Sequence, residues 1–229
     1  MKAVVHDRYG PPEVLQVRDV SQPVPDADEV LVRVHASTVT RTDCGVRSAR
    51  PFFVRLFTGL IRPKQPIAGI EFAGEVASVG KAVTAFAPGD RVFGVKSGSN
   101  AEYICVKERG AIARMPAVLS FEQAAALADG GCSALSTLRQ AGLQAGQRVV
   151  VYGASGSIGT AAVQVAKHQG AHVTAVCGPN AARARPFSRR RRGSRLHARG
   201  LRGRRREVRP RLRRGRQELV PSLSASGEP

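Results

Sequence analysis

The stretch RVVVYGASGSIGTAAVQVAKHQGAHVTAVC, residues 148–177, decides the fold of the second half of the chain. Residues 148–154 form a continuous apolar run, which is typical of a buried parallel strand. Residues 157–170 have the period of an amphipathic helix, and Gly170 is expected to cap it. Residues 171–177 predict another buried strand. A strand, a helix and a strand in this order indicate a βαβ unit.

Three glycines with the spacing G-x-x-G-x-x-G run from the end of the first of these strands into the start of the helix. Gly153 permits a sharp turn, Gly156 lets the backbone approach a pyrophosphate, and Gly159 lets helix and strand pack closely. The amides at the start of the helix then face the phosphates. A tight turn without a ligand is the alternative. The residues expected to bind the cofactor are Gly153, Ala154, Ser155, Gly156, Ser157, Ile158, Gly159 and, at the end of the second strand, Cys177.

The end of the second strand bears on the choice of nicotinamide cofactor. An Asp or Glu at this place would hold the ribose hydroxyls of NAD. Residues 175–181 read AVCGPNA and contain no acid, which leaves room for the 2′-phosphate of NADP. NADP, as NADPH, is therefore expected in preference to NAD. NAD stays open because no phosphate-binding residue is evident either.

The first 110 residues predict short strands separated by Pro- and Gly-containing turns, as in an antiparallel, barrel-like β domain. After them, residues 120–142 predict helix, with Ser120 and Gln123 at capping-box spacing. Gly130 and Gly131 are expected to split this helix in two. The strands are expected at residues 2–7, 15–20, 29–37, 70–80, 90–96 and 101–108.

Charge divides the chain unevenly. Residues 183–229 contain 17 Arg and three Glu, a net 17 − 3 = +14 of the total of +19, so residues 1–182 contribute only +5. The first part has an ordinary globular composition, whereas the Arg-rich part has too few apolar residues to bury a core. The cysteines form no CxxC pair, residues 1–14 lack a continuous apolar core, and no stretch approaches the ~20 apolar residues of a membrane span. A cytoplasmic protein without a membrane partner is expected.

Several segments together resemble a known family. IAGIEFAGEVASVG, FAPGDRVFGV, AEYICV and residues 148–177 occur in the order found in medium-chain dehydrogenases/reductases of the zinc-independent, quinone oxidoreductase-like branch. The resemblance covers residues 1–182. It implies an α/β chain with a GroES-like β-barrel catalytic domain at residues 1–118 and the first βαβ portion of a Rossmann domain at residues 119–182. It also implies NAD(P)H-dependent reduction of a quinone, an enone or a related carbonyl, and a homo-oligomer for full-length relatives.

The resemblance also suggests site residues. Thr40 stands where the zinc-dependent branch has its catalytic cysteine and the zinc-independent branch often has Asn, near the nicotinamide ribose. Ile70 replaces a zinc-ligating His, and Glu71 cannot hold a metal alone, so no metal site is expected. Ser133 stands where relatives often have a Thr that faces the cofactor. Thr40 and Ser133 are therefore the candidate catalytic residues, although Ser and Thr are also common in turns and caps.

Three interpretations compete for residues 183–229: an out-of-frame segment, a disordered Arg-rich tail, and a nucleic-acid-binding arm. If the codons after residue 182 are read one base later, permitted codons allow a product containing LGAD and YDLVFDAVG, which resembles the next segment of the same family. A frameshift near residue 182 is therefore expected, with an inactive, truncated chain and no specific nucleic-acid partner. The alternative function is non-catalytic NADPH binding or nucleic-acid binding through the basic tail.

Overall fold

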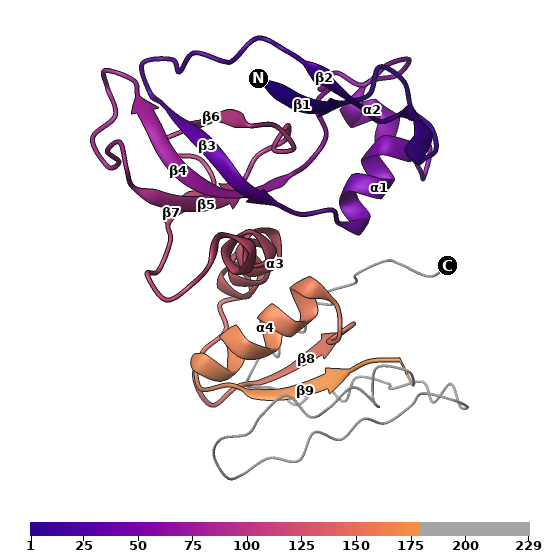
Figure 1. The fold of residues 1–229 in the computed structure, drawn as a ribbon. Coiled ribbons are helices and arrows are strands. Elements are labelled where there is room, and N and C mark those ends of the chain that lie inside the picture. The colour runs from indigo at the N-terminus through magenta and orange to yellow at the C-terminus, as the bar shows by residue number, and fades with distance from the viewer. Residues whose placement is uncertain (179–229) are drawn as a thin grey trace. The chain divides into compact units, whose positions relative to one another are not determined.

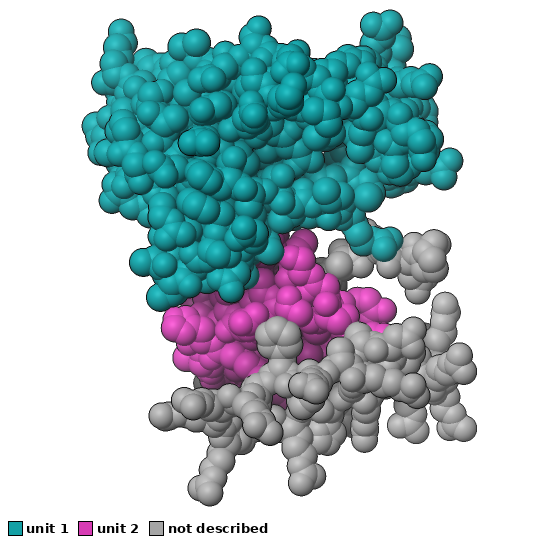
Figure 2. Space-filling view, viewed as in Figure 1, with its two compact units in different colours: residues 1–129 teal, residues 130–229 magenta. Residues whose placement is uncertain are grey.

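The computed structural model describes residues 1–178 (Figure 1). The chain divides into two compact units, residues 1–129 and residues 130–229 (Figure 2). The division falls inside helix α3 (Phe121–Gln140). The interpretations of residues 183–229 lie outside the described residues. The domain boundary expected at residue 118 stays a prediction.

The first unit is built on a five-stranded antiparallel sheet with the strand order β6-β3-β4-β5-β7. A separate antiparallel pair, β1 and β2, lies with two short helices at one end of this sheet (Figure 1). Register shifts in β3 against β4 after Leu31 and after Val34 bend the sheet, as bulges do in barrels. The strands are β1 (Lys2–Val5), β2 (Gln16–Asp19), β3 (Glu29–Ser37), β4 (Glu71–Val79), β5 (Arg91–Val95), β6 (Tyr103–Lys107) and β7 (Ile112–Arg114).

The core of this unit lies inside the curved sheet. Its buried members alternate along the strands, which explains why residues 29–37 and 71–79 could be recognised as strands from sequence. Phe72 is its largest fully buried side chain. The core consists of Val30, Val32, Phe72, Val76, Val92, Ile104 and Val106.

Three short helical elements in the first unit were not predicted from the sequence. They are the 3₁₀ helix η1 (Pro12–Val14), α1 (Arg41–Ser48) and α2 (Val54–Thr58). Helix α1 buries none of its residues, so it lacks the apolar stripe by which helices are usually recognised. Its capping signal, Thr40-x-x-Asp43, was nevertheless present in the sequence.

The second unit contains the expected βαβ arrangement. Strands β8 (Arg148–Tyr152) and β9 (His172–Val176) pair in parallel, and α4 (Ser157–His168) connects them. Figure 1 shows α4 lying along the two strands. Ala134 and Leu138 of α3 share a buried core with Val149 and Val151 of β8 and with Ala162 of α4. Gly170 follows the last turn of α4 with φ 79°, as expected for its capping role.

Sequence-based expectations about α3, β8 and β9 are wrong. None of the residues of β9 is fully buried, and His172 and Thr174 are exposed. Gly130 and Gly131 do not split the helix, because α3 is continuous from Phe121 to Gln140. Gly130 instead allows a close contact, since a Cβ at this position would lie 2.5 Å from Ser157 Oγ. Strand β8 is also not buried on both faces: Val150 and Tyr152 are 47% and 58% exposed, while Val149 and Val151 face the helices.

Candidate functional site

The glycine loop connects β8 to α4 and is fixed by backbone hydrogen bonds. Gly153 has φ 73°, a conformation that side chains with a Cβ rarely adopt. The Ala154 amide donates to the carbonyl oxygen of Val176 at 3.0 Å, which ties the loop to the end of β9. The Gly156 amide donates to the Gly153 carbonyl at 3.0 Å and closes the turn. The loop is therefore a defined turn at the carboxyl ends of two parallel strands, where nucleotides bind in open α/β sheets.

The second and third glycines of the motif differ in their surroundings. A Cβ at Gly159 would lie 2.2 Å from the Gly153 carbonyl oxygen, so this position must be glycine for α4 to pack against the loop. A Cβ at Gly156 would meet only that same oxygen, at 3.5 Å, so the fold itself does not demand glycine there. Gly156 leaves space at the start of α4. The first amides of a helix lack acceptors within the helix, and they favour an anion there.

The remaining predicted cofactor residues fall into two groups. Ser155, Gly156 and Ser157 are exposed at the tip of the loop. Ala154 and Ile158 pack with their side chains against the core of the second unit, so only their backbone could face a ligand. Cys177 is half-buried directly after β9, and no acidic residue lies beside it up to residue 178, where the described part ends. The loop therefore fits the pyrophosphate of a dinucleotide.

Thr40 is the N-cap of α1 and forms a complete capping box with Asp43. Its hydroxyl donates to Asp43 Oδ2 at 2.7 Å and accepts from the Asp43 amide at 3.3 Å. The Thr40 amide donates to the same carboxylate oxygen, also at 2.7 Å. The structure thus gives Thr40 a structural task, and its expected catalytic role remains a prediction.

Ser133 lies half-buried in α3, in the second unit, whereas Thr40 lies in the first. The Ser133 carbonyl oxygen accepts a hydrogen bond from Thr137 Oγ1 at 2.8 Å. This bond is local to the helix and is typical of Thr in helix interiors. It leaves the predicted role of Ser133 toward the cofactor as a prediction.

Glu71 is a buried carboxylate at the start of β4, with 3% of its surface exposed. The Thr38 hydroxyl donates to Glu71 Oε2, and the Asp129 amide donates to Glu71 Oε1 at 2.7 Å. Both oxygens are thus engaged by protein donors, as burial of a carboxylate requires. Within residues 1–178, no three His, Cys, Asp or Glu side chains come together as a potential metal site.

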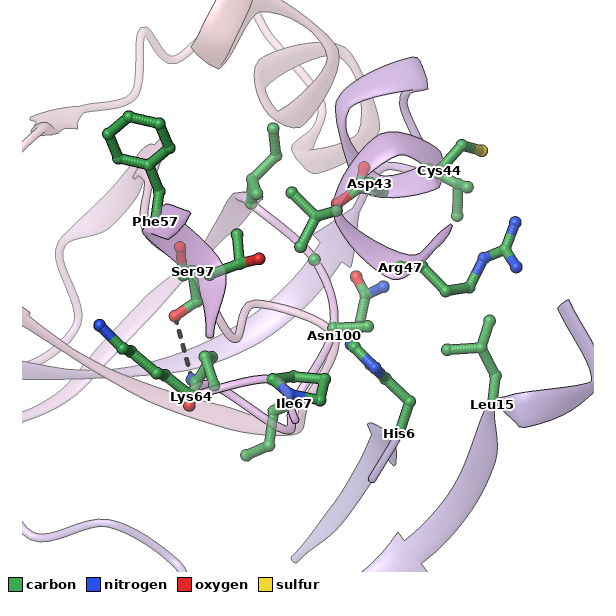
Figure 3. A pocket seen from close by; sticks show the side chains of 18 residues that line it. His6, Leu15, Asp43, Cys44, Arg47, Phe57, Lys64, Ile67, Ser97 and Asn100 are labelled. Carbon is green, nitrogen blue, oxygen red and sulfur yellow. Dashed lines mark hydrogen bonds between the residues drawn. The ribbon is translucent and has the colours of Figure 1, made fainter. Parts of the chain in front are cut away.

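A cavity of about 240 Å³ lies in the first unit, beside α1. Its wall is largely apolar and includes Val39, Val46 and Ile70, with Arg47 and Lys64 as cations. Asp43 Oδ1 and Asn100 Oδ1 lack hydrogen-bond partners, and Figure 3 shows the two side chains among those that line the cavity. Two unsatisfied acceptors on one cavity favour a guest that can donate hydrogen bonds.

Sequence reasoning missed some of this cavity. His6 on its lining is 2% exposed, and its Nδ1 lies 3.4 Å from the Arg8 carbonyl oxygen. Arg47, also on the lining, donates a hydrogen bond to the Gly10 carbonyl oxygen. The sequence carried no signal for either contact, because both partners are backbone oxygens brought together by the fold.

Comparison with known proteins gives the family. Residues 26–117 match the alcohol dehydrogenase GroES-like domain. Quinone oxidoreductase of Sus scrofa is 36% identical over 183 residues, which are 78% of this chain and 53% of that protein. The chain thus spans about half the length of the curated relatives it matches.

Solved structures agree with this result. The quinone oxidoreductase of Coxiella burnetii matches 79% of this chain and 57% of its own length, with TM-score 0.67 and 31% identity. The quinone oxidoreductase of Escherichia coli, solved with NADPH, matches 80% of this chain and 55% of its own, with TM-score 0.67 and 28% identity. Over the matched residues, the chain belongs to the zinc-independent, quinone oxidoreductase-like branch of the medium-chain dehydrogenases/reductases.

Proposed function

We propose that this chain contains the cofactor-binding loop and the catalytic β domain of an NADPH-dependent reductase. The observation that carries the proposal is the glycine loop: Gly153 has positive φ, Gly159 packs on Gly153, and Gly156 leaves space at the start of α4. NADPH, when bound, supplies the hydride. The chain's own task is to hold the pyrophosphate on the amides of residues 155–158. The absence of an acid beside Cys177 favours NADPH over NADH.

We propose a quinone, an enone or a related carbonyl as the substrate. The apolar wall of the cavity in the first unit suits the rings and chains of such a compound, and the hydroxyl groups of its reduced product can donate hydrogen bonds to Asp43 Oδ1 and Asn100 Oδ1. Arg47 and Lys64 on its lining can stabilise the negative charge that develops on a carbonyl oxygen as it accepts a hydride. A quinone or enone is already electrophilic, so its reduction does not require a metal. Thr40 and Ser133 are proposed as residues that orient the nicotinamide.

We also propose that residues 183–229 are read out of frame and that the chain in its present form has no reductase activity. The support is their composition: 17 Arg and no Lys, against 13 Arg and 6 Lys in residues 1–182. Sequencing of the coding DNA across codons 178–186 tests the frame directly. A clean reading with the present codons would contradict this part of the proposal.

One experiment separates the two proposals. The gene as it stands and a gene with one base deleted at codon 183 are expressed, and NADPH oxidation is measured with quinones and enones. We expect turnover only from the frame-corrected protein. Turnover by the present chain would contradict the frame proposal, and an inactive but folded frame-corrected protein would contradict the reductase proposal.

Nucleic-acid binding through the basic segment is the competing function. Any Arg-rich segment binds polyanions to some extent. A selected arm would discriminate between nucleic-acid sequences or structures, and deletion of residues 183–229 would abolish that discrimination. We expect only non-specific binding with a steep salt dependence.

A further inference from the structure

The segment around α2 exposes an unusual concentration of apolar side chains. Six large apolar residues within ten positions are between 60% and 84% exposed. Isolated exposed apolar residues are common, but a contiguous group marks an interaction surface. We call this group the apolar rim; it consists of Phe52, Phe53, Leu56, Phe57, Leu60 and Ile61.

The backbone beneath the apolar rim is held in place, so the side chains cannot simply turn inward. The Tyr9 hydroxyl lies 2.8 Å from Thr58 Oγ1 and donates to the Gly59 carbonyl at 2.7 Å. Thr58 Oγ1 in turn donates to the Val54 carbonyl oxygen at 3.0 Å, and the Lys64 amide donates to the Thr58 carbonyl oxygen at 2.8 Å. The two Tyr9 contacts tie the end of α2 to another part of the first unit, and the other two bonds hold α2 and the turn after it together. The rim is therefore a fixed feature of the surface.

The segment that carries the apolar rim has charged side chains of one sign only, although Asp43 lines the same cavity as Phe57 of the rim. No acidic residue occurs between Asp43 and Glu71, whereas Arg50, Arg62 and Lys64 flank the rim and are exposed. The Arg55 guanidinium stacks over the Tyr9 and Phe52 rings at 4.9 and 5.3 Å. An apolar group surrounded by cations is complementary to a surface that is apolar inside and anionic outside.

We propose that the apolar rim docks on an anionic lipid surface. Its Phe, Leu and Ile side chains carry no polar atoms and suit acyl chains, whereas protein-binding hot spots favour Trp, Tyr and Arg. A symmetric contact with a second copy would bring Arg50, Arg62 and Lys64 near their own counterparts. The earlier expectation of no membrane partner rested on the absence of a spanning stretch. No described helix is long and apolar enough to cross a membrane, but surface docking needs none.

The test uses the fact that the chain contains no Trp. Phe53→Trp places a single reporter on the rim, where Phe53 is 60% exposed, and Val118→Trp places one outside it, where Val118 is 89% exposed. The probe is a vesicle of phosphatidylcholine with phosphatidylserine, compared with pure phosphatidylcholine. With the anionic vesicle, we expect a blue shift and quenching by brominated acyl chains for F53W, and neither for V118W.

The two reporters separate insertion of the rim from adsorption of the Arg-rich segment, which would hold the protein on the vesicle without moving either spectrum. The F53W protein is also prepared with both Arg50→Glu and Arg62→Glu. This double charge reversal is expected to raise the concentration of anionic vesicles needed for half of the blue shift by about tenfold or more. Arg109→Glu, a reversal at an exposed residue away from the rim, should leave it unchanged.

Three results would overturn the proposal. The first is an F53W spectrum that stays constant with anionic vesicles. The second is an F53W spectrum already blue-shifted in buffer at all protein concentrations, since another part of the protein would then cover the rim. The third is a blue shift that develops with protein concentration in the absence of lipid, which indicates a second copy.

Discussion

Gly159 lies so close to Gly153 that a Cβ added at position 159 would stand 2.2 Å from the Gly153 carbonyl oxygen. This contact sets how closely α4 approaches the end of β8, and thus where the helix amides lie. Both glycines are therefore required by packing and backbone conformation, whereas the fold makes no such demand on Gly156 between them. Under the proposed function, Gly156 is the position of the motif that serves the cofactor.

The substitution Gly159→Val should disrupt the second unit. The added side chain collides with backbone, so the free energy of unfolding should fall by about 1–3 kcal/mol or more. Urea denaturation measures this loss. Gly131→Ala is the matched control: nothing lies within 4 Å of a Cβ there, and Ala in a helix interior should be as stable as glycine or more so by ~1 kcal/mol. Equal losses at the two positions would contradict the packing argument.

The side chain of Glu71 should stabilise the fold, although burying a carboxylate is costly in itself. Glu71→Ala removes the acceptor for the Thr38 hydroxyl and the Asp129 amide and empties a buried site, so the free energy of unfolding should fall by about 1–3 kcal/mol. Glu75→Ala, on an exposed position of the same strand, should change the free energy of unfolding by less than about 0.5 kcal/mol. Chemical denaturation of the two variants compares them directly. If E71A were as stable as E75A, the two hydrogen bonds would not be contributing.

Thr40 allows its structural and catalytic roles to be separated. Thr40→Val removes the capping side chain of α1 and should lower the free energy of unfolding by ~1 kcal/mol, whereas Thr40→Ser should keep the cap. If Thr40 also orients the nicotinamide, T40V in the frame-corrected protein should lower kcat at a temperature where both variants are fully folded. Unchanged kcat in T40V would leave Thr40 as a cap alone.

Asp90 should make the first unit sensitive to acid. A hydrogen bond from the Ala87 amide, and then the Arg114 guanidinium at 2.9 Å, hold the pKa of this carboxyl below its ordinary value of 3.8. The stabilisation is therefore complete above the ordinary pKa and is lost as pH falls through the lower folded-state pKa. The difference in Tm between the wild type and Asp90→Asn should shrink as the pH is lowered below about 4. A difference that stays constant over this range would contradict the assignment.

The sequence predicted those elements whose signal is local. The alternating run at residues 29–37 became β3, and Ser120 and Gln123 form the predicted capping box, with Ser120 N to Gln123 Oε1 at 3.0 Å. Gly153 and Gly156 lie in the predicted turn between β8 and α4, and Gly159 lies in the first turn of α4. In each case neighbouring residues alone determine the structure.

The features that could not be predicted depend on distant residues. The burial of His6 results from the meeting of β1 with the segments around Pro66 and α1. The sequence predicts a helix breaker at Gly130, but glycine is needed there because the position lies close to Ser157, which is 27 residues away in the sequence. The engagement of Glu71 by Thr38 and Asp129 joins residues from three parts of the chain.

The most direct test of the central claim is NADPH binding by the chain with Gly156→Asp. Gly156 has φ −78° and ψ 172°, which any residue adopts, and a Cβ there makes only an ordinary contact at 3.5 Å. The variant should therefore keep the circular dichroism spectrum and unfolding midpoint of the wild type. Its carboxylate would face the pyrophosphate, so calorimetry should show an affinity for NADPH at least about tenfold lower. Ser136→Asp, with the same charge change at an exposed position of α3, should bind like the wild type. Unchanged affinity in G156D, or a folded wild-type chain that binds no NADPH, would contradict the account.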